Sequence, residues 1–150
     1  MLQDAIEREI TVRATKERVF QAITDPKQIT VWFPNAIEGT LDVGESPVFD
    51  FGDGGRYRIF VEAVQPHEYF AYRWVPANVD NSTGFLGDVL ARPNTLVEFR
   101  LEDVLAGTLV KLKESGFASL PAAIAEKSLG QNSGGWDFML ERLVKVFGQE

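Results

Sequence analysis

The chain has 150 residues, a formal net charge of −7 and no cysteine. The missing thiols exclude disulfides, thiol catalysis and thiolate metal sites, and the single histidine excludes a His-rich metal site. A surface this acidic disfavours nucleic acid and anionic membranes as partners. The length favours one domain (1–150) with its own hydrophobic core, and we expect no metal and no cofactor.

The N-terminus carries charges where a secretory signal needs an apolar run. No stretch approaches the roughly 18 consecutive apolar residues of a membrane-spanning helix. These features predict a cytoplasmic protein that does not insert into a membrane.

The first elements along the chain are a strand and two short helices. Apolar residues alternate over 6–12, which predicts a strand. Thr15 and Asp25 are residue types that cap helix N-termini. The second helix is expected to begin at Pro26 and to end before Pro34.

A series of alternating segments follows the two helices. Their apolar residues recur at every second position, as in strands with one buried face. Turns rich in glycine and proline separate them, so the segments predict an antiparallel meander. The expected strands are 48–51, 57–64, 69–74, 95–102 and 108–114.

The connection at 76–93 interrupts this series. It is rich in Asn, Asp, Gly and Pro, and it also carries Phe85, Leu86 and Leu90. Connections this long within a compact domain are often functional. Its apolar residues are compatible with a protein partner or a homodimer.

The end of the chain carries the strongest helical pattern. Apolar residues recur with helical spacing on one face of 133–147, and Gly148 follows as a stop signal. A separate short helix is expected to start near Pro121. Together the segments predict an α+β fold, in which about six to seven antiparallel strands curve around a long C-terminal helix. The apolar face consists of Trp136, Met139, Leu140, Leu143, Val144 and Phe147, and the opposite side carries Asp137, Glu141, Arg142 and Lys145.

Short motifs in a characteristic order run through nearly the whole chain. With them the sequence resembles the SRPBCC superfamily (START-like, helix-grip folds), and it is most similar to the branch named after the activator of heat-shock protein 90 ATPase. The motifs are Arg18-Val19-Phe20, 22–26, Trp32-Phe33, Tyr72-Arg73-Trp74, 95–99, 114–117 and Gly135-Trp136 with Leu140 and Leu143.

This resemblance implies a cavity between the concave sheet and the C-terminal helix, in which many relatives bind apolar or amphipathic molecules. We therefore expect binding of a small hydrophobic molecule without catalysis, with the connection near Phe85 and Leu86 at the cavity mouth. Inward-facing aromatic residues suit such a pocket better than the aliphatic residues of a close-packed core. The expected ligand-binding residues are Trp32, Phe33, Phe51, Tyr57, Ile59, Phe70, Tyr72, Trp74, Phe85, Val97, Phe99, Leu112, Glu114, Phe117, Trp136, Leu140 and Leu143.

Two other functions stay open at this point. One is a protein-interaction module, co-chaperone-like or stress-related, which needs an exposed apolar patch. The other is an enzyme of the cyclase or dehydratase type, in which Glu114 meets Tyr57 or Tyr72 inside the pocket. Alternation places Glu114 on the inward face, where burial would raise its pKa. Alternatively, Glu114 ends its strand in water or pairs with Arg8. His67 is expected to be solvated in a turn.

Overall fold

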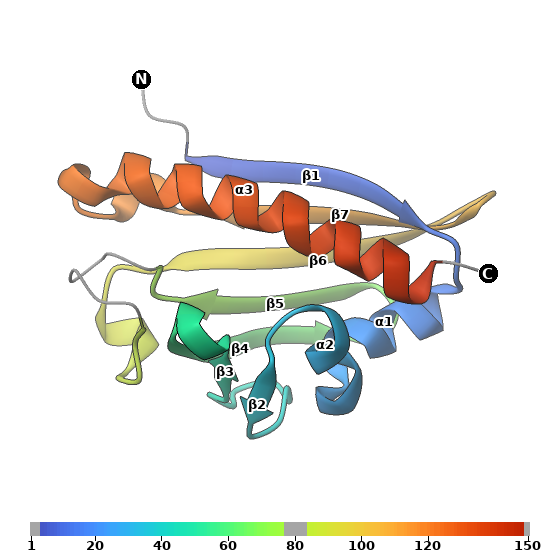
Figure 1. Cartoon of the computed structure of the whole chain (residues 1–150), viewed down its shortest axis with the longest axis horizontal. Helices are drawn as coiled ribbons and strands as arrows, with labels where there is room; N and C mark the ends of the chain where they lie inside the picture. Colours follow the sequence, from blue (N-terminus) through green and yellow to red (C-terminus); the bar gives the residue numbers. More distant parts are fainter. Residues whose placement is uncertain (1–3, 77–83, 149–150) are drawn as a thin grey trace.

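One antiparallel sheet and one long helix form the body of the molecule (Figure 1). The structure is a computed structural model that describes residues 4–76 and 84–148. The strand order across the sheet is β1-β7-β6-β5-β4-β3-β2. This is the expected helix-grip fold. The strands are β1 (Ala5–Val12), β2 (Ala36–Glu38), β3 (Val48–Asp50), β4 (Arg56–Gln65), β5 (Tyr69–Trp74), β6 (Thr95–Val104) and β7 (Gly107–Ser115).

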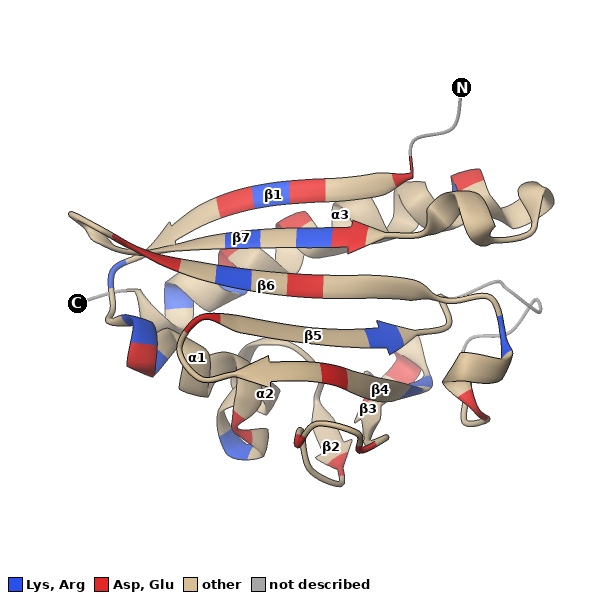
Figure 2. Cartoon of the chain, turned by 180° about the vertical axis from the view of Figure 1, so that it is seen from behind, with Lys and Arg blue, Asp and Glu red and all other residues tan. Residues whose placement is uncertain are grey.

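The face of the sheet opposite the long helix is charged. Figure 2 shows Lys, Arg, Asp and Glu positions of both signs along β1, β6 and β7. Lys111 pairs with Glu102 at 2.7 Å, and Arg100 lies 3.3 Å from Glu98. Such exposed pairs contribute little to stability, but they keep this face hydrated. The hydrophobic core therefore lies on one side of the sheet only.

The two short helices follow β1, as the capping residues predict. They are α1 (Lys16–Thr24) and α2 (Pro26–Trp32). Thr15 Oγ1 accepts a hydrogen bond from the Arg18 amide at 3.2 Å, and Asp25 Oδ1 accepts one from the Lys27 amide at 2.9 Å. The single residue Asp25 therefore ends α1 and caps α2.

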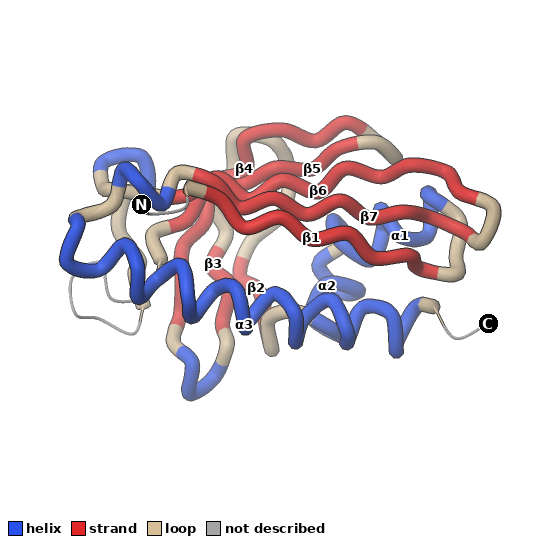
Figure 3. Tube along the Cα trace, turned by 90° about the horizontal axis from the view of Figure 1, so that it is seen from above, coloured by secondary structure: helices blue, strands red, loops and turns tan. Residues whose placement is uncertain are grey.

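The C-terminal helix is longer than expected. It is one continuous helix, α3 (Ala122–Phe147), rather than a short helix near Pro121 followed by a second one over 133–147. It lies along the sheet, with α1 and α2 near its C-terminal end (Figure 3). The expected break was wrong, because Gly134 and Gly135 weaken a helix without stopping it. Buried residues that precede and follow these two glycines pack against the core, and this packing keeps the chain helical through Gly134 and Gly135.

The strand β2 was missed in the sequence. It has only three residues and pairs with β3, with Ile37 opposite Phe49. Ile37 is half buried, between exposed Ala36 and Glu38. A single inward residue gives no alternation that could be recognised.

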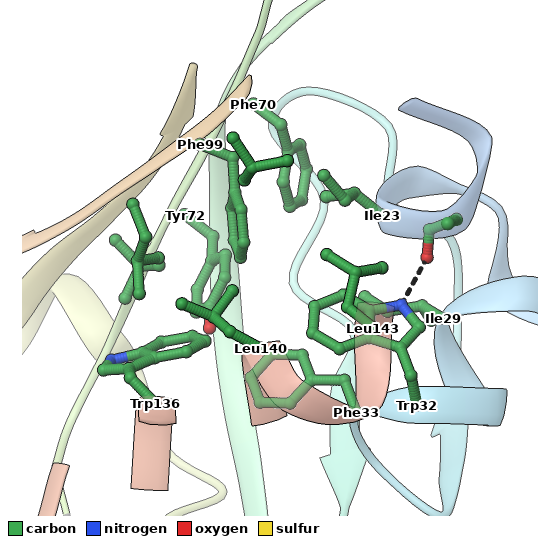
Figure 4. Packing of buried hydrophobic residues seen from close by; sticks show 14 of the residues in the cluster. Ile23, Ile29, Trp32, Phe33, Phe70, Tyr72, Phe99, Trp136, Leu140 and Leu143 are labelled. Atoms are coloured by element: carbon green, nitrogen blue, oxygen red, sulfur yellow. Dashed lines mark hydrogen bonds between the residues drawn. The ribbon is translucent and has the colours of Figure 1, made fainter. Parts of the chain in front are cut away.

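The middle of the space between sheet and helix is closely packed (Figure 4). The Trp32 and Phe99 rings lie 6.4 Å apart, and Phe99 lies 5.9 Å from Trp136, both edge to face. The Trp32 indole donates to the Ala22 carbonyl at 2.7 Å and so joins α2 to α1. Leu143 of α3 is fully buried in the same cluster. This part of the interface is solid core.

None of the helices in 4–76 and 84–148 is long and apolar enough to cross a membrane.

Replacing Gly134 with alanine is expected to raise the free energy of unfolding by about 0.5–1 kcal/mol. An added Cβ at Gly134 meets nothing within 4 Å, so the gain in helix propensity is not offset by a clash. Chemical denaturation at neutral pH measures the change. Gly107→Ala is the contrasting control, because a Cβ there lies 2.3 Å from the Val12 carbonyl oxygen. It should destabilise the protein.

Candidate functional site

A cavity of about 550 Å³ lies where the middle of α3 faces the ends of β3, β4 and β5. It is adjacent to the packed core, not within it. Its lining comes from four parts of the chain, and most of it is aromatic or apolar. The lining residues are Phe33, Asn35, Phe51, Gly54, Tyr57, Trp74, Val75, Pro76, Gln131, Asn132, Gly135, Trp136, Met139 and Arg142.

Three rings on three different elements form the inner wall. Phe33 at the end of α2 lies 5.2 Å from Trp136 of α3 and 6.1 Å from Trp74 of β5. Trp74 and Trp136 lie 6.2 Å apart. These separations are typical of favourable aromatic contacts. The wall therefore has ordered, mutually supporting rings.

Tyr57 and Phe51 continue this wall, and the Phe51 ring lies 5.5 Å from the Phe33 ring. The Tyr57 and Phe51 rings lie 6.0 Å apart, and each lies within 6.3 Å of Trp74. Burial raises the pKa of Tyr57, so its hydroxyl keeps its proton at neutral pH. The backbone here is held by Phe85, whose amide donates to the Arg56 carbonyl at 2.8 Å.

The mouth of the cavity is polar or open. Asn35, Gly54, Gln131 and Gly135 line the cavity and are all solvent-exposed. The inner rings Tyr57, Phe33 and Trp136 are buried, as are Val75 and Pro76 at the end of β5. The site is thus an apolar pocket that opens at a rim of small and amide-bearing residues.

Behind the aromatic wall lies a buried carboxylate. Glu114 Oε1 accepts a hydrogen bond from the Trp136 indole at 2.8 Å, and Oε2 accepts one from the Trp74 indole at 2.9 Å. The Thr95 hydroxyl donates to Oε2 at 2.6 Å. The Asn132 amide nitrogen lies 3.1 Å from Oε1 and 3.0 Å from Oε2. One carboxylate therefore fixes three residues that line the cavity.

The electrostatics of Glu114 follow from this setting. Its side chain is fully buried, and no Lys or Arg of 4–76 or 84–148 pairs with it. Burial raises the pKa of Glu114, and the hydrogen bonds from Thr95, Trp74, Trp136 and Asn132 oppose that rise. The strand explains the position, because Val110, Leu112 and Glu114 share the inward face of β7.

The family follows from the sequence match. The family model of the Activator of Hsp90 ATPase homolog 1-like protein matches residues 13–148. The chain belongs to this family. Its fold is that of the SRPBCC superfamily, whose members bind hydrophobic ligands or act as polyketide cyclases. A search of the curated proteins gave no significant match.

Solved structures similar to this Activator of Hsp90 ATPase homolog 1-like chain share its fold. DynU16, a protein of the dynemicin biosynthetic locus, is 25% identical with a TM-score of 0.78, and the match covers 99% of this chain and 48% of DynU16. The chain thus spans about half the length of DynU16. The Aha1 dimer from Colwellia psychrerythraea is 20% identical, with a TM-score of 0.75 and 98% coverage of both chains. MLL2253 from Mesorhizobium loti is 21% identical, with a TM-score of 0.74 and 94% coverage of both.

The cavity collects only part of the expected ligand-binding set. The residues that line it are Phe33, Phe51, Tyr57, Trp74 and Trp136. Glu114 lies directly behind them. The residues buried in the core instead are Trp32, Ile59, Phe70, Tyr72, Val97, Phe99, Leu112, Phe117, Leu140 and Leu143. Phe85 supports the β4 backbone, and its ring faces Arg92 rather than the cavity, with the guanidinium carbon 5.6 Å from the ring centre.

Several lining residues were missed in the sequence. Gln131, Asn132 and Gly135 fall in the part of α3 that was read as a break or as the first turn of the helix. Met139 lies on the recognised apolar stripe and could have been included. Arg142 was assigned to the outer side of the helix, although its position is three residues beyond Met139.

The contacts expected for an enzyme are not formed in the described part of this family member. Glu114 makes no hydrogen bond to Tyr57 or Tyr72, and the Tyr72 hydroxyl is buried without a partner there. Glu114 does not pair with Arg8 either, because Arg8 binds Asp137 at 2.7 Å. Among the described residues no group of His, Asp and Glu could hold a metal ion.

The exposed apolar residues that a protein-interaction module would need lie outside the cavity. Leu86 and Leu90 are 47% and 53% exposed, and they belong to the connection at 76–93. Residues 77–83 of that connection lie outside the described residues. His67 is exposed in the turn between β4 and β5, as expected.

Proposed function

We propose that this protein binds one small hydrophobic or amphipathic molecule in the cavity between α3 and the ends of β3, β4 and β5, and does not transform it. The observation that carries this proposal is the aromatic lining of a pocket of about 550 Å³. Ligand sites typically have roughly 300–1,000 Å³, with apolar walls and a few polar groups.

The rigidity of the walls also favours binding. The indoles of Trp74 and Trp136 are both held by Glu114. Their orientation is therefore fixed without a ligand, which lowers the entropy lost on binding. The flat rings of this wall favour a ligand with a planar or extended apolar body.

The titratable side chains that line the cavity favour binding over catalysis. Tyr57 and Arg142 are the titratable side chains among the described lining residues. The raised pKa of Tyr57 keeps its hydroxyl protonated at neutral pH, so this group cannot act as a general base, and a guanidinium does not give up its proton. Glu114 is enclosed behind the rings and fully buried. No group with the properties of a general base therefore faces the cavity in the part of the chain described.

Titration of the purified protein with planar hydrophobic compounds tests the proposal. Two of the three tryptophans, Trp74 and Trp136, line the cavity, whereas Trp32 lies in the core. A bound aromatic molecule should quench most of the intrinsic fluorescence and give a 1:1 adduct in native mass spectrometry. At a ligand concentration of 100 Kd the fold should gain about 2.7 kcal/mol. Absence of adduct, quenching and thermal shift across a broad panel would overturn the proposal.

A further inference from the structure

The cavity has one charged group in an otherwise neutral lining. Among the described residues that surround it, only Arg142 carries a charge. The whole chain has a net charge of −7, so the charge of the cavity lining is opposite in sign to that of the protein as a whole. Arg142 lies on α3, one turn beyond Met139 and near the end of α2.

The charge of Arg142 is not neutralised by its neighbours. The nearby acids of α3 are engaged elsewhere, since Asp137 binds Arg8 at 2.7 Å and Glu141 lies 3.6 Å from Lys145. No carboxylate in 4–76 or 84–148 lies within ion-pair distance of the Arg142 guanidinium. An anion that enters the cavity thus meets an uncompensated cation.

The guanidinium is nevertheless held in place. Arg142 Nη2 donates to the Val31 carbonyl at 3.2 Å, and the group lies 6.0 Å from the centre of the Phe138 ring. The side chain is partly buried. A guanidinium has five N–H donors in a rigid fork, so one bond to Val31 leaves others for a ligand. A planar acid can accept two of them at once.

Asn132, at the other end of the α3 residues that line the cavity, offers a ligand a second polar group. Asn132 directs its amide nitrogen at both oxygens of Glu114. Its carbonyl oxygen accepts no hydrogen bond from any residue of the described ranges. The ten-residue separation from Arg142 corresponds to about 15 Å along the helix.

We infer that the molecule bound in this cavity is an anionic amphiphile, whose carboxylate or similar planar acid group binds Arg142 while its apolar body lies against Trp74 and Trp136. The inference rests on the proposed binding function. In a partly desolvated pocket the charge-assisted pair is stronger than it would be in water. The acid group therefore gives orientation as well as affinity.

Calorimetric titration with a matched pair of ligands tests the inference. Anthracene-9-carboxylate and 9-anthracenemethanol share the ring system and differ in the charge. The wild type should bind the carboxylate at least about tenfold more tightly, in line with the worth of a charged hydrogen bond. Arg142→Gln should remove this preference and leave the affinity for the alcohol unchanged.

The control is Lys145→Gln, which removes the same charge from the same helix. Lys145 is exposed and does not line the cavity, so the preference for the acid should persist. If Arg142→Gln does not fold, Arg142→Lys keeps the charge but loses the fork, and it should weaken the preference. Equal binding of both compounds to wild type would overturn the inference and leave the proposed function standing. Binding of neither compound would count against the proposed function itself.

Discussion

Replacing Glu114 with glutamine is expected to lower the free energy of unfolding by about 1–3 kcal/mol for each hydrogen-bond donor left without an acceptor. The indoles of Trp74 and Trp136 can only donate, and they bind different oxygens of the carboxylate. An amide offers one acceptor oxygen and points its own N–H groups at the remaining donors. At least one indole therefore loses its partner in a fully buried site.

Chemical denaturation at neutral pH measures this loss, with Glu126→Gln as the control. Glu126 is an exposed residue of α3, and its replacement should leave stability unchanged. A Glu114→Gln variant as stable as wild type would contradict the assigned role of the carboxylate. The tryptophan emission of Glu114→Gln should also shift, because the two cavity indoles lose a fixed hydrogen bond.

The same pair of proteins should differ in pH dependence. Burial raises the pKa of Glu114 in the folded state above its ordinary value of 4.5. Between the unfolded and folded values, the folded state binds a proton that the unfolded state does not. The stabilisation from this group is thus fully present below about pH 4.5 and is lost as the pH rises through the folded-state pKa. The stability difference between wild type and Glu114→Gln should therefore shrink toward higher pH. A difference that grows with pH would contradict the direction of the shift.

Replacing Gly135 with leucine is expected to weaken ligand binding by about 100-fold or more without unfolding the protein. Gly135 lines the cavity, and an added Cβ there meets nothing within 4 Å. A leucine side chain can occupy the space that a ligand needs. Leucine also has a higher helix propensity than glycine, so α3 should become more stable by about 0.5–1 kcal/mol.

The adjacent residue offers a matched control. Gly134 lies in the same helix, is exposed, has open space around a Cβ and does not line the cavity. Gly134→Leu should therefore show the same gain in helix stability and normal binding. Thermal unfolding and the calorimetric titration described above measure the two effects separately. If both leucine variants bind equally well, the ligand occupies another site.

Alternation along strands indicated which apolar residues face inward, and it left Glu114 open between the inward face and water. It could not predict which inward-facing residues lie in the packed core and which line the cavity, because that depends on the position of each residue along its strand. Phe70 and Trp74 share one face of β5, yet Phe70 is in the core and Trp74, the last residue of the strand, borders the pocket. The Glu114 network also escaped prediction, since its donors come from β5, β6 and α3. Only the fold brings them together.

The residues of α3 that line the cavity were even harder to predict from the sequence. A short helix near Pro121 and a second helix over 133–147 were expected, but the buried apolar residues on either side of Gly134 and Gly135 outweigh the weak helix propensity of these glycines. The charge of Arg142 suggested the outer face. Its long side chain, however, reaches the Val31 carbonyl and the cavity from the edge of the stripe.

A single carboxylate that holds a strand indole and a helix indole has a consequence for selectivity. The two rings cannot move relative to one another unless at least one leaves Glu114, and that departure would leave an indole N–H without its acceptor. The two adjacent rings, whose centres lie 6.2 Å apart, therefore keep a fixed mutual orientation. On the proposed binding function, we expect this rigid aromatic wall to favour flat molecules over bulky ones of equal hydrophobicity.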